Sequence, residues 1–237
     1  MNVSVKGPEI LWDFYGIKIT ETIRNGWIIM LFITLLCIWL ASGLKKQNPG
    51  KKQIIAEKIV GFFYGLTDDV MGKKYQSFAP YIGALFMFSL FGSLSSLLGA
   101  RPMTGDLNTT LGWSLMTFVM VQVNNMRLNG FFGWLRSFAS PVAFMLPLNI
   151  ISEVANPVSM AFRHFGNIAS GIVISALVYA ALAAGSNALL ANTFLGGVPI
   201  LQICIPAVLS IYFDLFTSFL QAYIICMLTM VFVSGVE

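Results

Sequence analysis

The stretch that decides the fold is residues 138–184, FASPVAFMLPLNIISEVANPVSMAFRHFGNIASGIVISALVYAALAA. It is predominantly apolar and is interrupted only by Pro141, Pro147 and Pro157. An upright helix needs only about 20 residues to cross the hydrocarbon core of a bilayer, and this stretch is more than twice that length. We therefore predict a long membrane helix that is strongly tilted or bent at a proline. After a connection at 185–198, a second long apolar segment runs from about 199 to 234.

The composition of the whole chain supports a membrane protein. Of 237 residues, 57% are hydrophobic and 10% are charged, and the mean hydropathy is +0.79. A soluble domain carries about 25% charged residues. The 20 Phe and 12 Met also exceed what one soluble core of this size buries. These values exclude a soluble globular enzyme and a disordered chain, and they predict an all-α, polytopic membrane protein.

The other apolar segments predict the order of the remaining elements. A first span covers about 25–44, and KKQNPGKK follows it. Residues 53–72 mix charged and apolar side chains at helical spacing, which is typical of an amphipathic helix lying on the membrane surface. Two further spans cover about 79–99 and 109–126. We expect a single integral membrane domain over 1–237, since the sequence shows no soluble domain. The sequence has no internal repeat, which argues against a free-standing secondary transporter, and no glycine motif that would bind a nucleotide.

The basic residues predict the orientation in the membrane. Nine of the 14 Lys and Arg lie in two connections on the same side, namely Lys45, Lys46, Lys51, Lys52, Lys58, Lys73, Lys74, Arg127 and Arg136. The positive-inside rule makes that side cytoplasmic, so the N-terminus is outside and the C-terminus is inside. No nucleic-acid partner is expected, because the basic residues lack interleaved aromatic and polar surface. Three scattered cysteines argue against a disulfide framework and a metal site, and no cofactor is expected.

Polar side chains form a line along the long stretch. Their spacings of 3, 4, 3, 4, 4 and 3 residues put them on one helix face, and they are Asn149, Ser152, Asn156, Ser159, Arg163, Asn167 and Ser170. A second line on the last segment consists of Ser210, Asp214, Thr217 and Gln221. The first line is a candidate ion path or a seam against a partner. Packed together, the two lines would enclose a hydrated path.

Few side chains in these segments can ionise, and each has an alternative reading. They are Glu153, Arg163, His164 and Asp214. A charge at the centre of a membrane helix costs about 2.5–3.5 kcal/mol on insertion scales, and arginine does not lose its proton in a protein. A functional role is therefore favoured for Arg163 over a purely packing role. Glu153 and Asp214 fit an ion path or structural polar pairs, and His164 fits a packing role or a further ion-path group. The Ser, Thr and Asn side chains alternatively only hydrogen-bond neighbouring helices.

With these residues in place, the chain resembles the subunit a family of F-type ATP synthases over about 25–235. PLNIISEVANPVSMAFRHFGNIASG is similar to the segment of that family built around a hydrophobic-Arg-x-Phe-Gly-Asn core. LQAYIICMLTMVFVSG is similar to the last-helix motif, PMTGDLNTT to an outer loop, and NPGKKQIIAE to the start of the amphipathic segment. The Phe-Gly-Asn form of the motif resembles that of bacterial or plastid members rather than mitochondrial ones, and the acidic residue at Glu153 resembles Gram-positive-like bacterial members.

The resemblance implies roles for individual residues. Arg163 matches the essential arginine that faces the rotating ring of c subunits, and Gln221 matches the glutamine near it. Asp214 matches a position lining one aqueous half-channel. Glu153 matches a position that is acidic in some members. Asn149, four residues earlier, stands where many other members have glutamate. Asn167 matches the asparagine of the core motif.

Two positions depart from the family pattern. Ile172 stands where many members have Glu or His, and His164 where Leu is usual. The carboxylate role near the outer half-channel then falls to Asp214 and Glu153, or His164 takes part.

The resemblance also implies a function and partners. The chain would be a non-catalytic stator subunit in a bacterial plasma membrane, coupling proton or sodium flow to ring rotation and ATP synthesis. Its partners would be the c-subunit ring, the b subunits of the peripheral stalk, the remaining synthase subunits and the lipid bilayer, and its two long segments would form a tilted hairpin. Sodium would bind only transiently. The rivals are a free-standing channel or secondary transporter that uses Arg163 and Asp214, and a structural membrane anchor.

Overall fold

The computed structural model describes the chain except for residues 1–8, 15–16, 46–49, 140–142, 191–210 and 236–237. Six α-helices dominate the described part: α1 (Glu21–Ala41), α2 (Lys51–Met71), α3 (Ala79–Leu94), α4 (Leu107–Ser137), α5 (Leu146–Leu190) and α7 (Thr217–Ser234). Short 3₁₀ segments are η1 (Lys73–Phe78), η2 (Ser95–Leu98), η3 (Met103–Gly105) and η4 (Ala143–Met145). A π-helical segment, η5 (Ile211–Phe216), leads into α7.

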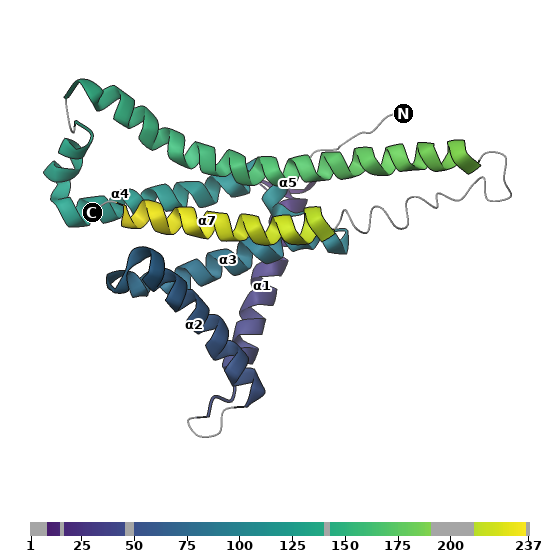
Figure 1. Cartoon of the computed structure of the whole chain (residues 1–237), viewed down its shortest axis with the longest axis horizontal. Coiled ribbons are helices and arrows are strands. Elements are labelled where there is room, and N and C mark those ends of the chain that lie inside the picture. The colour runs from purple at the N-terminus through teal and green to yellow at the C-terminus, as the bar shows by residue number, and fades with distance from the viewer. Residues whose placement is uncertain (1–8, 15–16, 46–49, 140–142, 191–210, 236–237) are drawn as a thin grey trace.

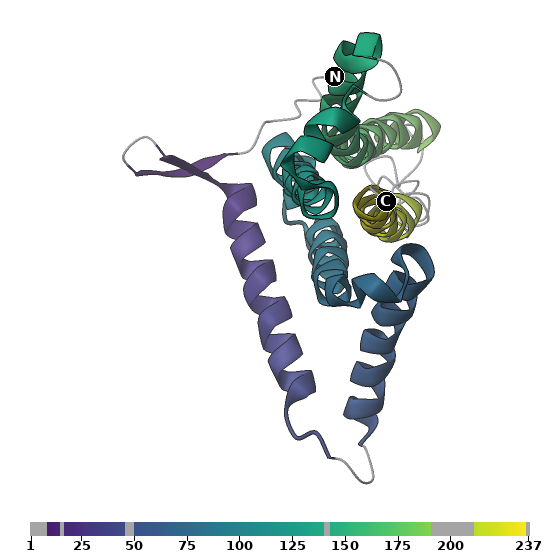
Figure 2. The same ribbon diagram turned by 90° about the vertical axis from the view of Figure 1, so that its left-hand side faces the viewer.

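The helices fall into two groups with different directions. Helices α3, α4, α5 and α7 run along the long axis of the molecule, whereas α1 and α2 slope steeply away from them (Figure 1). The view along the long axis shows the four nearly end-on, with α1 and α2 forming a V beside them (Figure 2). Helix α5 leads away from the end of α4, and α7 returns beside it in the opposite direction (Figure 1).

Four helical segments are long and apolar enough to cross a membrane: Glu21–Ala41, Lys73–Leu98, Leu146–Ser186 and Asp214–Ser234. The predicted first span, second span and two long segments correspond to these four. The predicted amphipathic helix is α2, which is not among them. The predicted third span is α4, which is also not among them and is longer than predicted.

Helix α5 is one continuous helix of 45 residues with Pro157 inside it. At 1.5 Å per residue it is about 68 Å long, so it fits within a ~30 Å hydrocarbon core only if it is strongly tilted from the membrane normal. Pro147 lies in the first turn, where a missing backbone N–H costs nothing. The predicted start of this helix at 138 is too early. Residues 131–137 still belong to α4, and α5 begins only at Leu146. Of the predicted last segment, 199–210 lie outside the described residues.

The structure also contains a small sheet that the all-α prediction lacks. Strands β1 (Ile10–Phe14) and β2 (Ile17–Thr20) pair antiparallel just before α1. The start of α1 is then tied to the PMTGDLNTT loop, since Thr22 Oγ1 donates to Asp106 Oδ2 at 2.9 Å. Asp106 Oδ1 also accepts from the backbone N–H of Asn108 and caps α4. One residue of the PMTGDLNTT loop thus joins two helices.

The core lies where α3 packs against α2 and α7. Phe63, Phe86 and Met230 are among its buried side chains. Hydroxyl groups link helices inside it, with 3.2 Å between Thr117 Oγ1 and Thr229 Oγ1. Such small polar contacts are typical of packed membrane helices. This core holds α4, α5 and α7 together and so positions the polar residues.

Candidate functional site

Most side chains of the polar face of α5 are exposed. Ser152, Asn156, Ser159, Arg163, Asn167 and Ser170 are exposed, and Asn149 is half-buried. Among the described residues, no side chain forms a hydrogen bond or ion pair with Arg163. An unpaired guanidinium on a helix of this apolarity needs a partner or a wet surface outside the chain. The prediction that both polar lines face each other is therefore only partly met.

One contact does join the two lines. Asn167 Nδ2 donates to Gln221 Oε1 at 3.1 Å, and Gln221 is 2% exposed. Arg163 lies one helical turn before Asn167 and shares its face. The bond fixes α7 against α5 at the level of the arginine. The remaining surface around Arg163 stays open.

Asp214 lies in the π-helical segment η5, directly before the N-terminal end of α7. Its Oδ1 accepts from Ser96 Oγ of η2 at 3.2 Å. Thr217 turns back on the same segment, and its Oγ1 donates to the carbonyl oxygen of Tyr212 at 3.0 Å. Wider π turns are frequent at functional positions in helices. Asp214 is half-buried and is about 10 Å along the helix from Gln221.

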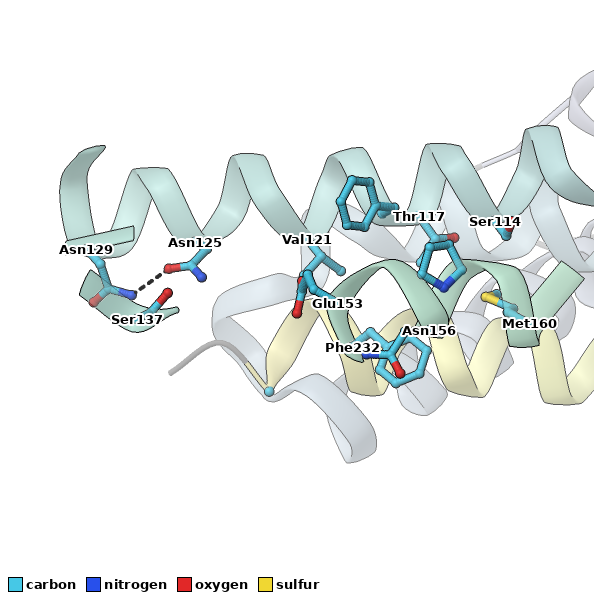
Figure 3. Close-up of a pocket in the computed structure, with 13 residues that line it drawn as sticks. Ser114, Thr117, Val121, Asn125, Asn129, Ser137, Glu153, Asn156, Met160 and Phe232 are labelled. Carbon is cyan, nitrogen blue, oxygen red and sulfur yellow. Dashed lines mark hydrogen bonds between the residues drawn. The ribbon is translucent and has the colours of Figure 1, made fainter. Parts of the chain in front are cut away.

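A cavity of about 310 Å³ lies between α4, α5 and the end of α7. Most of its polar lining comes from uncharged side chains, and Glu153 is the only acid among the described lining residues. The polar residues are Ser114, Thr117, Asn125, Asn129, Ser137, Glu153 and Asn156. Figure 3 shows Glu153 reaching from α5 towards α4 beside Val121. The cavity is large enough for several waters, and its side chains offer them hydrogen bonds.

The two carboxylates lie far apart. Glu153 lines the cavity beside Phe232 and Gly235, at the end of α7, whereas Asp214 precedes its start. Eighteen residues separate Asp214 from Phe232, which is about 27 Å of helix. The expectation that Asp214 and Glu153 serve one half-channel together does not fit this geometry. Arg163 lies between them, about 15 Å beyond Glu153 along α5.

His164 and Ile172 lie on the packed side of α5. His164 is 1% exposed, and its ring meets that of Trp113 edge-on at 5.5 Å between centroids. Neither ring nitrogen has a hydrogen-bond partner in the described part of the chain. Ile172 lies beside Gly105 of η3. Neighbouring residues of α5 thus present a charge outward at Arg163 and a histidine inward.

Several site residues were missed by the sequence analysis. Gln122 Nε2 donates to Glu153 Oε1, and Ser96 holds Asp214. Asn125 and Asn129 line the cavity and hydrogen-bond each other at 2.9 Å (Figure 3). The signal was the run of amides at the end of the predicted third span, VQVNNMRLN. In the described residues there is no cluster of three metal-ligating side chains.

Comparisons with known proteins bear on the same segments. The sequence profile of the ATP synthase A chain family matches residues 25–234. The sodium ion specific ATP synthase subunit a of Propionigenium modestum is 32% identical over 254 aligned residues, covering 96% of this chain and 81% of that protein. ATP synthase subunit a 2 of a Bradyrhizobium species is 32% identical, covering 99% and 96%. Subunit a of Moorella thermoacetica is 36% identical, covering 68% and 74%.

Proposed function

Because this chain belongs to the ATP synthase A chain family, the multi-pass, ion-translocating membrane subunits of F-type ATP synthases, we propose that its exposed α5 face meets a rotating ring of c subunits. The observation that carries the proposal is Arg163, which is exposed and lacks a partner among the described residues. A ring carboxylate that has just released its ion is the partner this charge requires.

The permanent charge of Arg163 has two effects in this arrangement. It attracts each deionised ring carboxylate as it passes, and it repels cations that would leak directly between two access paths. Asn167 and Gln221 hold the helices at this level through their hydrogen bond. Neither effect requires covalent chemistry, so the chain acts as a non-catalytic stator and ATP forms on other subunits.

Two separate access paths are the second part of the proposal. Asp214 with Ser96 and Thr217 serves the outer path, and the cavity with Glu153 and Asn156 serves the inner one. Asn149 lies one turn before Glu153, and Ser152, Ser159 and Ser170 continue the face on both sides of Arg163. The offset between the two carboxylates supports this division, because an ion can change paths only by riding on the ring. His164 and Ile172 we assign to packing.

The energy comes from the membrane potential. Moving one charge across 100 mV is worth about 2.3 kcal/mol, and ring rotation converts this into torque. Protons and sodium ions both fit this scheme. The relative from Propionigenium modestum is described as sodium ion specific, and that supports testing sodium first. Beyond the ring, the partners we propose are the b subunits of the peripheral stalk, in a bacterial plasma membrane.

The experiment is ATP-driven ion uptake into inverted membrane vesicles, with and without sodium. Arg163→Ala should abolish coupled uptake while the complex still assembles, and dependence on sodium would name the ion. Arg127→Ala is the matched control, because Arg127 is exposed on α4 away from the cavity lining and should transport normally. Full uptake by the Arg163 variant would refute the proposal.

The same vesicles separate the rivals. A free-standing channel or secondary transporter gated by Arg163 and Asp214 predicts transport by the purified chain without a ring. The two side chains form no ion pair in the described structure, which does not favour a direct gating pair. A structural anchor predicts that Arg163→Ala leaves coupled transport intact.

A further inference from the structure

Glu153 is held by a chain of two hydrogen bonds that originates on another helix. Trp134 Nε1 donates to Gln122 Oε1 at 2.7 Å, and Gln122 Nε2 donates to Glu153 Oε1. Trp134 and Gln122 both belong to α4, whereas Glu153 belongs to α5. The three side chains are half-buried, so water competes only partly for these bonds.

The direction of this chain follows from chemistry alone. An indole N–H is a donor and never an acceptor, so the atom of Gln122 that meets Trp134 must be its carbonyl oxygen. The amide nitrogen of Gln122 then has to face Glu153. A carboxylate is the acceptor that such a donor prefers. Trp134 thus selects the orientation of Gln122 that binds the ionised form of Glu153.

The local backbone makes this arrangement possible. Gly130 has φ +69°, and α4 turns there before its last stretch, residues 131–137. The turn brings Trp134 back to Gln122, twelve positions earlier in the chain. The indole ring is packed in place by Phe138, edge-on at 5.3 Å between centroids, and by Phe131 at 5.8 Å.

We propose that Trp134 and Gln122 are positioning residues that hold the carboxylate of Glu153 towards the cavity, where it captures the transported ion. The proposal rests on the assignment of the cavity as the inner access path. One oxygen of Glu153 is anchored by Gln122, while Oε2 has no hydrogen-bond partner among the described residues and is available to a cation. Figure 3 shows the carboxylate at the side of the cavity that faces α4.

The test uses the assembled synthase in inverted vesicles, where ATP hydrolysis draws ions in from the former cytoplasmic side. The initial rate of uptake is measured against external pH and against sodium concentration. Trp134→Phe removes the donor and keeps an aromatic ring between Phe131 and Phe138. We expect the half-saturating ion concentration to change about three- to tenfold, the effect of one lost hydrogen bond, with a smaller change in maximal rate. Because the lost donor stabilised the ionised carboxylate, proton uptake should reach half-saturation at a lower proton concentration. Sodium uptake should need a higher concentration, because the carboxylate is no longer held towards the cavity.

A double-mutant cycle separates positioning from general destabilisation. In a Glu153→Gln background, Trp134→Phe should have no further effect on half-saturation, because the carboxylate it acts through is gone. Trp27→Phe on α1 is the matched control, since that indole is 54% exposed and forms no hydrogen bond in the described structure. Should the Trp134 variant fail to assemble, Gln122→Met interrupts the same chain.

An unchanged half-saturation in Trp134→Phe, or an equal effect with and without Glu153, would overturn the positioning role. That failure is distinct from failure of the proposed function. If Arg163→Ala still abolishes uptake while Trp134→Phe leaves half-saturation unchanged, only the positioning role is lost. If Arg163→Ala transports normally, the assignment of the paths is lost as well.

Discussion

Arg163 and His164 show how one step along a helix separates two roles. Consecutive residues of an α-helix point about 100° apart, so one side chain reaches the surface while the next enters the core. Arg163 is exposed and unpaired in the described structure, whereas His164 is 1% exposed against Trp113. The charge is therefore available to the ring partner proposed above, whereas the histidine packs against α4.

Replacing His164 by phenylalanine tests the packing role. Both ring nitrogens are buried without a partner in the described residues, and an unsatisfied buried polar group costs about 1–3 kcal/mol. A phenyl ring keeps the edge-on contact with Trp113 and removes that cost. We expect His164→Phe to withstand thermal dissociation of the complex at least as well as the native chain, with uptake within about twofold. Lost uptake in an assembled complex would instead make His164 an ion-path residue.

At the scale of elements, α4 shows how a single glycine directs a site. Gly130 has φ +69° and ψ 170°, a backbone region that is almost restricted to glycine and costs other residues about 1–3 kcal/mol, although a Cβ there would meet nothing within 4 Å. Gly130→Ala should therefore disturb the direction of residues 131–137 rather than their packing. It should shift the half-saturating ion concentration in the same direction as Trp134→Phe.

Gly112 provides the control within the same helix. It is helical and a Cβ there would also meet open space, so Gly112→Ala should leave ion uptake unchanged and favour the helix by about 1 kcal/mol. The comparison is made on uptake against ion concentration and on thermal stability of the complex. Equal behaviour of the two variants would show that the turn at Gly130 does not matter for the cavity.

These elements also show what the sequence could predict. Apolar length identified the four segments that are long and apolar enough to cross a membrane, and the 3.5-residue spacing identified the exposed face of α5, because both depend only on local sequence. The turn at Gly130 was missed, since glycine permits a left-handed conformation without requiring it. The hairpin before α1 was missed because its strands have only 5 and 4 residues, and only the shorter one alternates apolar and polar side chains.

The site was harder to predict than the fold because its contacts join distant parts of the chain. Gln122 lies 31 positions before Glu153, and Ser96 lies 118 positions before Asp214. No periodicity connects such pairs, so only the packing of α4 on α5 and of η2 near η5 reveals them. The separation of the two carboxylates along α7 likewise follows from tertiary structure alone.

For the whole molecule, the exposed face of α5 predicts where the proposed ring of c subunits makes contact. Ser159 is exposed one turn before Arg163, whereas Ala161 is 1% exposed on the packed side. A cysteine at Ser159 should form a disulfide with a cysteine on the outer helix of the ring under mild oxidation, and a cysteine at Ala161 should not. The product is read on non-reducing gels of the assembled complex. Equal cross-linking at both positions would contradict the predicted contact face.

The direction of α1 across the membrane gives the last prediction. This helix connects the N-terminal hairpin, with Trp12 exposed, to the lysine-rich segment that begins α2 at Lys51. If the basic segment is cytoplasmic, the hairpin is outside. In a chain with Cys37, Cys204 and Cys226 replaced by alanine, a membrane-impermeant maleimide should label Lys51→Cys in inverted vesicles and Trp12→Cys in intact cells.

The reverse combinations should remain unlabelled until the membrane is permeabilised with detergent. Detergent labelling of both variants shows that each cysteine is reactive, so that absence of label reports sidedness rather than burial. Because α1 crosses once between the two positions, both should change sides together if the orientation is inverted. Labelling of both cysteines from the same side would mean that α1 does not cross the membrane. That result would contradict the expectation from its 21 mostly apolar residues and its exposed apolar side chains.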